Sequence, residues 1–339
     1  MKVVTFGEIM LRLAPHGYYR FTQAHDYEAT FGGGEANVAV SLANYGDEAR
    51  FVTKLPTHEI GDSAVNDLRA NGVDTDFITR GGERVGIYFL EKGASQRASN
   101  VIYDRAHSSI ATAKPEDFDW DAIFTDADWF HFTGITPALG DNVAAICEEA
   151  CKVAKAKGVR ISCDLNYRKK LWSTKEASET MTKLAKYIDV LIANEEDSEK
   201  VFGIKSHATD VTAGSLNREG YIDVAKQLKE KFNFEYVAIT LRESITANDN
   251  RWGAMVYVDQ KPYFSKQYDI HIVDRVGGGD SFAGGLIYAL MHGYEPQEAV
   301  DFAVAASCLK HSIEGDYNRV SVAEVTALAA GDGTGRVQR

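Results

Sequence analysis

The sequence predicts an α/β fold in which a mainly parallel sheet lies between two layers of helices. From about residue 118 onward, short apolar strand patterns alternate with amphipathic helical patterns, as in consecutive right-handed βαβ units. Two glycine runs, at 32–34 and 277–279, each open an apolar helical pattern. Two further strand patterns within 84–105 stand outside the alternation and predict a small separate sheet.

The composition is that of a globular protein with a large core. The chain has 339 residues, of which 45% are hydrophobic and 25% are charged. Its formal net charge of -12 argues against a nucleic-acid surface, although a local basic cluster can still bind an anionic substrate. No apolar run approaches the ~20 residues of a membrane span, and no signal-peptide pattern precedes the first strand. We therefore expect a cytoplasmic protein that binds neither nucleic acid nor membrane.

The four cysteines lack the spacing of a zinc site. Two of them lie four residues apart on a predicted helix, so a metal or redox pair is one interpretation. Burial as small apolar side chains is the other, and it suits a protein kept reduced in the cytoplasm. The cysteines are Cys147, Cys151, Cys163 and Cys308.

The N-terminal third is expected to hold a strand–helix unit and the strands of the small sheet. The glycines at 32–34 start a helix that stops at Gly46, a residue suited to the left-handed conformation of a helix end. Residues 16–31 look irregular. The other predictions are a first strand at 3–6, a strand at 51–55, a helix at 61–71, and small-sheet strands from about 8–14 and 84–105.

The rest of the chain, to about residue 330, is expected to complete a single domain. Strand patterns at 255–258 and 263–264 predict an antiparallel hairpin at the sheet edge. Residues 203–217 predict a loop, and 331–339 predict a disordered tail. The predicted strands are 129–132, 159–164, 190–193 and 236–240, and the predicted helices are 141–157, 174–187, 195–202, 221–231, 280–292 and 296–311.

The C-terminal glycine run, Gly277 to Gly279, leads directly to Asp280 in the first turn of a predicted helix. Glycines let backbone N–H groups approach a ligand, and a helix N-terminus adds unpaired donors, so this stretch predicts a phosphate site. A carboxylate beside a phosphate can serve as a base that takes the proton of an attacking hydroxyl. Capping of free amides is the alternative interpretation of Asp280. We expect Gly278→Val to place a side chain in the phosphate position, with loss of activity and little change in melting temperature.

Charged residues follow two strands at their carboxyl ends, the edge where such sheets bind ligands. Arg168 follows the strand ending at Asp164, and its planar fork suits a carboxylate or a phosphate. A solvated basic turn is also compatible with this position. Residues 194–197, Asn-Glu-Glu-Asp, follow the next strand, where carboxylates can favour a helix start or hold Mg²⁺ through water molecules.

Asp274-Arg-Val-Gly-Gly-Gly-Asp280 resembles the C-terminal signature of ribokinase-like (PfkB-type) carbohydrate kinases, Asp-Thr-x-Gly-Ala-Gly-Asp. The resemblance implies a three-layer α/β/α domain with a small β-sheet lid, Asp280 as general base and the amides of 277–279 as an anion hole. It also implies ATP and Mg²⁺ as cofactors. Residues 33–37 resemble the family's N-terminal signature, which would place Gly33, Gly34 and Asn37 at the sugar.

The same resemblance implies a set of nucleotide-binding residues. Arg242 stands where a glycine is usual, in an expected turn after Thr240, and Arg275 stands where a threonine is usual. The family pattern Asn-x-x-Glu leaves Asp197 or Glu196 as the residue that serves Mg²⁺ through water. The nucleotide-binding set is Asn194, Thr240, Arg242, Ser244, Gly277 and Gly279.

Arg12 stands where many of these kinases have an aspartate that reads sugar hydroxyls. Together with Tyr103-Asp-Arg105-Ala and Asp164-Leu-Asn-Tyr-Arg168, it resembles the 2-keto-3-deoxygluconate kinases of the family. The resemblance implies that ATP phosphorylates this acid sugar to its 6-phosphate, with Arg168, aided by Arg105, binding the carboxylate. The matching substrate positions are Gly34, Tyr88, Tyr103, Arg105 and Arg168.

Several alternatives stay open at this point. A kinase of another sugar, such as fructose or ribose, would bind its substrate without an arginine. A regulatory protein on the same fold would lack the Asp280 carboxylate, which is present. Dehydrogenases and P-loop kinases are disfavoured because their glycine motifs are absent. The sequence motifs are compatible with both the gluconate and the galactonate epimer of the substrate. We also expect a homodimer or higher oligomer that assembles through the small sheet.

Overall fold

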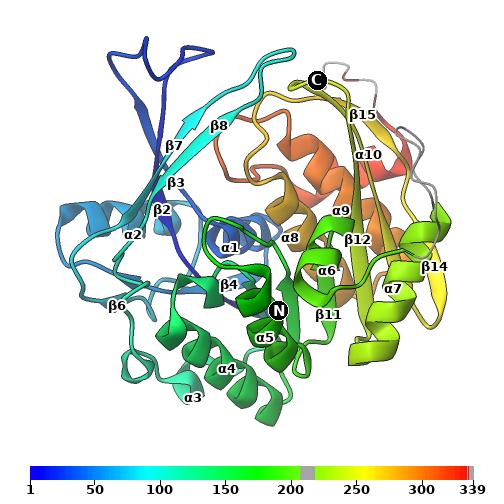
Figure 1. Cartoon of the computed structure of the whole chain (residues 1–339), viewed down its shortest axis with the longest axis horizontal. Helices are drawn as coiled ribbons and strands as arrows, with labels where there is room; N and C mark the ends of the chain where they lie inside the picture. The colour runs from blue at the N-terminus through cyan, green and yellow to red at the C-terminus, as the bar shows by residue number, and fades with distance from the viewer. Residues whose placement is uncertain (207–217, 334, 336–339) are drawn as a thin grey trace.

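The computed structural model describes residues 1–206, 218–333 and 335 (Figure 1). Within these residues nine strands form the main sheet, in the order β14-β13-β12-β11-β10-β9-β1-β4, with β15 also paired to β13. Strands β4, β1, β9, β10, β11 and β12 pair in parallel, whereas β13, β14 and β15 form an antiparallel edge. The bounds are β1 Lys2–Phe6, β4 Glu48–Val52, β9 Trp129–Thr133, β10 Arg160–Asp164, β11 Val190–Ala193, β12 Tyr236–Ser244, β13 Asp249–Val258, β14 Lys261–Phe264 and β15 Tyr268–His271.

Helices cover both faces of the main sheet, as the strand–helix alternation predicts. Side chains of α1, α2, α8, α9 and α10 share one core cluster with the sheet, and side chains of α3 to α7 share the other. The predicted three-layer arrangement is confirmed. The bounds are α1 Gly34–Asn44, α2 Glu59–Ala70, α3 Trp120–Ile123, α4 Asp141–Ala156, α5 Thr174–Ala185, α6 Glu195–Phe202, α7 Arg218–Phe232, α8 Gly278–Met291, α9 Pro296–Lys310 and α10 Val322–Ala330, with short 3₁₀ turns at Pro115–Asp117 and Pro137–Leu139.

The small sheet consists of β3, β2, β7 and β8 in that order, and it projects from the main body (Figure 1). Its central pair, β2 and β7, is parallel, and the two edge strands pair antiparallel with them. The predicted small-sheet strands at 8–14 and 84–105 are thus present. The bounds are β2 Met10–Ala14, β3 Glu28–Gly32, β7 Gly86–Glu91 and β8 Asn100–Asp104.

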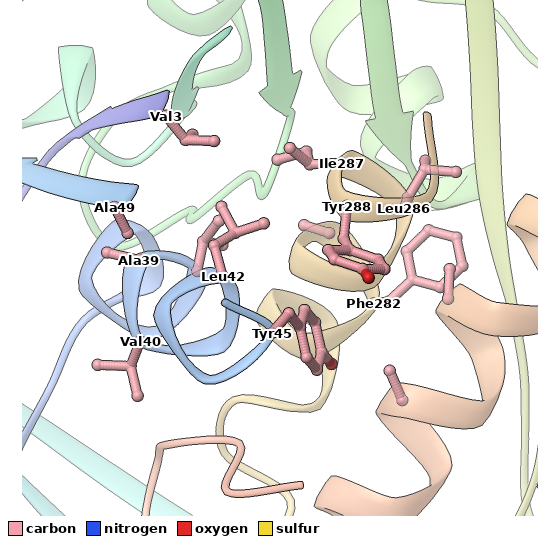
Figure 2. Close-up of a cluster of buried hydrophobic side chains, with 14 of the residues drawn as sticks. Val3, Ala39, Val40, Leu42, Tyr45, Ala49, Phe282, Leu286, Ile287 and Tyr288 are labelled. Carbon is pink, nitrogen blue, oxygen red and sulfur yellow. The ribbon is translucent and has the colours of Figure 1, made fainter. Parts of the chain in front are cut away.

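The helices α1 and α8, which follow the two glycine runs, pack against each other (Figure 2). A Cβ added at Gly284 of α8 would lie 2.8 Å from the Cβ of Ser41 on α1, so only a glycine permits this approach. Further along the contact, the rings of Tyr45 and Tyr288 have centroids 5.2 Å apart. The close packing fixes the N-terminal turns of both helices relative to each other, and those turns carry candidate site residues.

Side chains cap the starts of two helices on the second face of the sheet. Ser173 caps α5 by accepting from the N–H of Glu176, and the Glu176 side chain accepts in return, which makes a capping box. The side chain of Asn194 caps α6 in the same way through the N–H of Asp197. At its other end, α6 stops at Gly203 in the left-handed conformation, which glycine adopts at little cost.

Several sequence predictions were wrong in detail. Residues 16–31 were expected to be irregular, but Glu28–Gly32 forms strand β3, because pairing with β2 supplies hydrogen bonds that local propensity does not reveal. The single strand expected at 51–55 is two strands, Glu48–Val52 and the short β5 Lys54–Leu55, which pairs with β6 Thr79–Arg80. The structure also adds α3, β15 and α10, for which no prediction was made.

Other expectations have mixed outcomes. Much of the predicted loop at 203–217 and of the predicted tail at 331–339 lies outside the described residues. Three cysteines are buried and the fourth is partly buried, and all four are unpaired, which agrees with the apolar interpretation. In the described part of the chain, no helix combines the length and the apolar character needed to cross a membrane.

Candidate active site

A cavity of about 400 Å³ lies between the carboxyl ends of the main-sheet strands and the small sheet. A wider hollow of about 990 Å³ adjoins it and shares the side chains of Tyr103, Arg105 and Arg168. The cavity lining includes most of the residues singled out in the sequence. They are Gly33, Gly34, Asn37, Tyr88, Tyr103, Arg105, Arg168, Asn194, Asp197, Thr240, Arg242, Gly277, Gly279 and Asp280.

Asp280 stands in the first turn of α8 and faces the cavity. Its carboxylate accepts a hydrogen bond from Asn37 Nδ2 on α1, with a distance of 2.6 Å. Burial raises the pKa of Asp280 to about 7, even though the Asn37 hydrogen bond and the nearby charge of Arg168 lower it. A Cβ added at Gly34 would lie only 3.6 Å from Asp280 Oδ1. The two glycine-led helices therefore bring Asn37, Gly34 and Asp280 to one point.

The three glycines before Asp280 have different surroundings. Gly277 caps α8 with φ 80°, and a Cβ there would lie 2.0 Å from the carbonyl oxygen of Asp316. Gly279 lines the cavity, and a Cβ on it would meet nothing within 4 Å. A Cβ on Gly278 would instead lie 2.4 Å from the imidazole of His311. The expectation that a side chain at Gly278 enters the phosphate position is wrong, because that side chain points into the core.

Gly33 and Gly34 also differ in where an added side chain would point. A Cβ on Gly33 would lie 1.9 Å from the carbonyl oxygen of Glu8, so this glycine permits a close backbone crossing. The Gly33 N–H donates to Asn37 Oδ1. Of these two glycines, Gly34 is the one whose open side faces Asp280.

Behind the small-sheet wall lies a buried cluster of charges centred on Arg12. The Arg12 guanidinium donates to Asp274 at 2.5 Å and to Asp316 at 2.8 Å. The hydroxyl of Tyr88 also donates to Asp316, at 2.6 Å. Arg12 is only 3% exposed, so it connects the small sheet to the loop before the glycines rather than reaching into the cavity. The sequence offered no signal for Asp316, which lies in a loop after α9.

Arg105 follows strand β8 and is held by a second buried ion pair. Its Nε donates to Glu8 at 2.7 Å, and its Nη2 donates to the same carboxylate. The other carboxylate oxygen of Glu8 accepts from the hydroxyl of Ser108 at 2.6 Å. Tyr103 completes this wall, with its ring over the Arg105 guanidinium at 5.4 Å and beside Tyr88 at 6.1 Å. Glu8 was not singled out in the sequence, and it neutralises the charge of Arg105.

Arg168 stands on the opposite wall, after strand β10, and its side chain is exposed. Among the described residues, its guanidinium donates one hydrogen bond, from Nη1 to the carbonyl of Tyr167 at 3.1 Å. Asp164 and Asp197 lie nearby in the cavity lining. Burial raises the pKa of both carboxyls, to about 6 for Asp197, and the charge of Arg168 lowers both. No role at the site was predicted for Asp164 from the sequence, but it is a cavity carboxylate.

Some of the residues expected to bind the nucleotide lie on a strand and not in the predicted turn. β12 continues from Tyr236 to Ser244, so residues 240–244 form a strand rather than the expected turn. Pairing with β13 across this whole stretch explains the difference. Thr240 and Arg242 line the cavity, whereas Ser244 is exposed and is not among its lining residues. Asn194 lines the cavity and donates from Nδ2 to Asp197 at 2.9 Å.

A comparison of the whole sequence with family models gives a match to the pfkB family carbohydrate kinases over residues 1–321. The chain belongs to this family. A relative from Haloferax volcanii, named 2-dehydro-3-deoxygalactonokinase, is 33% identical over 334 residues, which cover 98% of each chain. A 2-dehydro-3-deoxygluconokinase from Thermoproteus tenax is 27% identical and covers 93% of this chain and 90% of its own length.

A solved structure supports the family assignment. The crystal structure of 2-dehydro-3-deoxygluconokinase from Thermotoga maritima superposes with a TM-score of 0.94 and 56% sequence identity, covering 98% of this chain and all of that one. The predicted ribokinase-like fold with its main and small sheets is thus confirmed, and the chain is an ATP-dependent sugar kinase of the PfkB family.

Proposed function

We propose that this PfkB-family kinase transfers the γ-phosphoryl group of ATP to the 6-hydroxyl of 2-keto-3-deoxygluconate, also called 2-dehydro-3-deoxygluconate. The observation that carries the proposal is Arg168, a cavity arginine without a carboxylate partner among the described side chains, in the same cavity as Asp280. A neutral sugar needs no cation, whereas an acid sugar needs one for its carboxylate. The names of the relatives from Thermoproteus tenax and Thermotoga maritima support the same substrate.

In the proposed reaction, Asp280 takes the proton of the sugar hydroxyl as its oxygen attacks the γ-phosphorus, and ADP leaves. A carboxyl with a pKa of about 7 is well matched to this task near neutral pH. Asn37 orients the carboxylate through its 2.6 Å hydrogen bond. None of the described side chains caps the start of α8, and the N–H groups of its first turn, next to the open face of Gly279, stabilise the negative charge on the transferring group.

The sugar is proposed to lie against Gly34, with Tyr88 and Tyr103 along its small-sheet side. Arg168 binds the C1 carboxylate. Arg105 contributes N–H donors rather than net charge, because Glu8 already neutralises it. This arrangement keeps the expectation from the sequence that Arg168 binds the carboxylate with the aid of Arg105, and it limits that aid to hydrogen bonding.

Mg²⁺ fits this site only through water molecules and the donor phosphates. The described residues contain no group of three or more histidine, cysteine, aspartate or glutamate side chains that could hold a metal directly. Asp197 is buried and Asp164 is partly buried, and a cation would stabilise the ionised form of either carboxyl. When bound, Mg²⁺ would supply positive charge at the phosphates. Of the two candidates from the sequence, we favour Asp197, because Glu196 lines only the wider hollow.

A second candidate substrate is the epimer 2-keto-3-deoxygalactonate, which the name of the Haloferax volcanii relative favours. Both substrates carry the carboxylate that Arg168 would bind, so the arginine does not separate them. We also retain the proposals that the enzyme works in the cytoplasm and assembles through its small sheet. Ile102 of β8, which is 48% exposed, supports the latter.

The proposed function is tested by an assay that couples ADP release to a spectroscopic signal across a panel of sugars. The panel contains both keto-deoxy acids, gluconate, fructose and ribose. We expect the largest kcat/KM for 2-keto-3-deoxygluconate. A larger value for the galactonate epimer would select the second candidate, and a preference for fructose or ribose would contradict an acid-sugar substrate.

A further inference from the structure

Two departures of this sequence from the family signatures lie in the same part of the structure. Arg275 replaces the usual threonine in the segment between β15 and the glycine run, and Arg242 replaces a usual glycine on β12. Both side chains line the cavity, together with Gly277 and Gly279. Segments far apart in the sequence therefore place two unusual cations beside the proposed phosphate site.

Each of the two arginines is oriented by a neighbour that leaves most of its donors free. Arg242 pairs with Trp252 in the sheet register, and its guanidinium lies 5.2 Å from the centroid of that buried ring. Arg275 donates from Nη2 to the carbonyl of Ala247 at 3.0 Å. Because a guanidinium carries five N–H donors, both of these cavity-lining arginines retain unused donors.

The electrostatics of this corner are those of a site without its anion. Neither arginine forms an ion pair with a carboxylate among the side chains that the structure describes. Arg242 is exposed at the cavity, and partial desolvation of its guanidinium, followed by the charges of Arg275 and Arg168, lowers its pKa. The same corner lowers the pKa of His311 to about 4, mainly through burial, with Lys310, Arg242 and Arg275 contributing. Positive charges that crowd together without a counter-ion disfavour the empty state and favour a bound polyanion.

We propose that Arg242 and Arg275 act as a pair that binds the β- and γ-phosphate oxygens of the nucleotide donor. This inference rests on the proposed function as an ATP-dependent kinase. The planar forks of the two arginines can each bond two phosphate oxygens. Arg275 lies two residues before Gly277, and Arg242 lies over Trp252, whose ring centroid is 5.3 Å from that of His311, the residue that packs against Gly278. This position next to the glycine run assigns both arginines to the donor phosphates and not to the sugar. Arg275 is thereby added to the nucleotide-binding residues.

The test compares the binding of ADP, AMP and adenosine by isothermal titration calorimetry in the absence of sugar. The variants are Arg275→Thr, which restores the usual family residue, and Arg242→Gln. Arg275→Lys retains the charge without the fork. The matched control is Arg251→Gln on β13, since Arg251 lies on the same hairpin but is paired with Glu243 and Asp269.

For Arg275→Thr and for Arg242→Gln, we expect ADP affinity to fall about 10–150-fold, the range for one charge-assisted hydrogen bond. Adenosine affinity should change little, and Arg275→Lys should recover part of the loss. The double variant should lose less than the product of the single losses, because both residues act on the same phosphates. Arg251→Gln should bind all three ligands like the wild type.

Two outcomes would overturn the proposal. Equal loss of ADP and adenosine affinity would mean that the arginines shape the pocket instead of binding phosphate. Unchanged ADP affinity in properly folded variants, judged by an unaltered melting temperature, would mean that they do not contact the donor. Because no sugar is present, the result is independent of whether the acid-sugar assignment is correct. A wild-type protein that binds none of the three ligands would contradict the kinase proposal itself.

Discussion

The arginines of the small-sheet side and those of the main-sheet side of the cavity have opposite environments. Arg12 and Arg105 are buried and bonded to the carboxylates of Asp274, Asp316 and Glu8. Arg168, Arg242 and Arg275 line the cavity without a carboxylate partner among the described side chains. The same residue type thus serves two purposes a short distance apart.

The difference indicates how residue type and environment together assign a function. An arginine whose charge is neutralised inside the protein holds two segments together, and its removal would leave carboxylates buried and unpaired. An arginine without a partner retains its charge for a ligand. If this distinction is correct, substitutions on the two sides should affect different measured quantities, either stability or ligand binding and turnover.

The largest expected effect is on turnover and concerns Asp280, which lies in the cavity between the two groups of arginines. Asp280→Asn should lower kcat by roughly 10²–10⁴-fold, since the variant cannot accept the proton of the attacking hydroxyl. Binding of ADP should change little. Steady-state kinetics with calorimetry checks both expectations. A variant with near-normal kcat would reduce Asp280 to a cap of α8.

The next effect compares the two arginine groups directly. Arg12→Met should lower the free energy of unfolding by about 3–5 kcal/mol, because Asp274 and Asp316 would stay buried without their partner. The matched variant Arg242→Met should lose at most about 1 kcal/mol, the size of its contact with Trp252. Urea unfolding curves measure both. Equal losses would remove the distinction between paired and unpaired arginines.

A milder variant covers the case in which Arg12→Met does not fold. Tyr88→Phe removes only the hydroxyl that donates to Asp316 at 2.6 Å. We expect it to fold and to lose about 1–3 kcal/mol, the cost of leaving a buried acceptor with one partner fewer. A loss near zero would show that the cluster does not stabilise the contact between the small sheet and the glycine loop.

Arg168 is the unpaired arginine assigned to the sugar, and its expected effect depends on substrate charge. Arg168→Ala should lower kcat/KM for 2-keto-3-deoxygluconate about 10–150-fold, the equivalent of ~1.5–3 kcal/mol for one charged hydrogen bond. Arg168→Lys should show a smaller loss of kcat/KM than Arg168→Ala, because it keeps the positive charge but lacks the planar guanidinium fork. Phosphorylation of fructose, which lacks the carboxylate, is the control. Equal losses with both sugars would assign Arg168 to phosphate or to structure.

Most of the main sheet and its helices could be predicted from the sequence, because buried parallel strands and amphipathic helices leave strong periodic patterns. Strand β3 could not, since its first two residues are exposed and it depends on pairing with β2. The extension of β12 to Ser244 had the same cause, because β13 supplies its hydrogen bonds. In both cases the tertiary partner, rather than local propensity, decides the conformation.

The site was predictable where function is concentrated in short motifs, as at Gly277–Asp280 and Gly33–Asn37. The pairing of charges was not. Arg12 and Asp316 are 304 residues apart in the chain, and nothing in either segment indicates the other. For the same reason the sequence suggested Arg105 as a free carboxylate ligand, whereas Glu8 neutralises it. Residue type predicted which groups are present, and only the fold determined which of them remain available.

The glycine run offers a further test that separates stability from activity. Gly278→Val should lose roughly 1–3 kcal/mol of stability through overpacking, because its side chain would point at His311. Gly279→Val should largely retain stability but lose turnover, because its side chain would point into the open cavity. Thermal unfolding and kcat of the two variants measure the contrast. Similar behaviour of both would mean that the run is only a structural turn.

The smallest expected effect is a shift in pH dependence. A base with a pKa of about 7 must be deprotonated to act, so kcat/KM should rise with pH up to about 7 and then level off. The Asn37 hydrogen bond favours the ionised carboxylate and lowers its pKa. Asn37→Ala should therefore move this acidic limb, the rise of kcat/KM with pH, to higher pH. The measurement is the midpoint of the rise and not the maximum value of kcat/KM.

Stability provides an independent check on the same group. The Asp280 carboxyl ionises near 3.8 when unfolded and near 7 when folded, so its ionisation weakens the fold increasingly as pH rises between these values. Asp280→Asn removes this penalty and should gain stability over the wild type across that interval, with a constant difference above it. The variant with the lowest turnover would then be more stable than the wild type, the reverse of Arg12→Met. A pH-independent difference would mean that Asp280 is not held with a raised pKa, and another group would then have to account for the acidic limb.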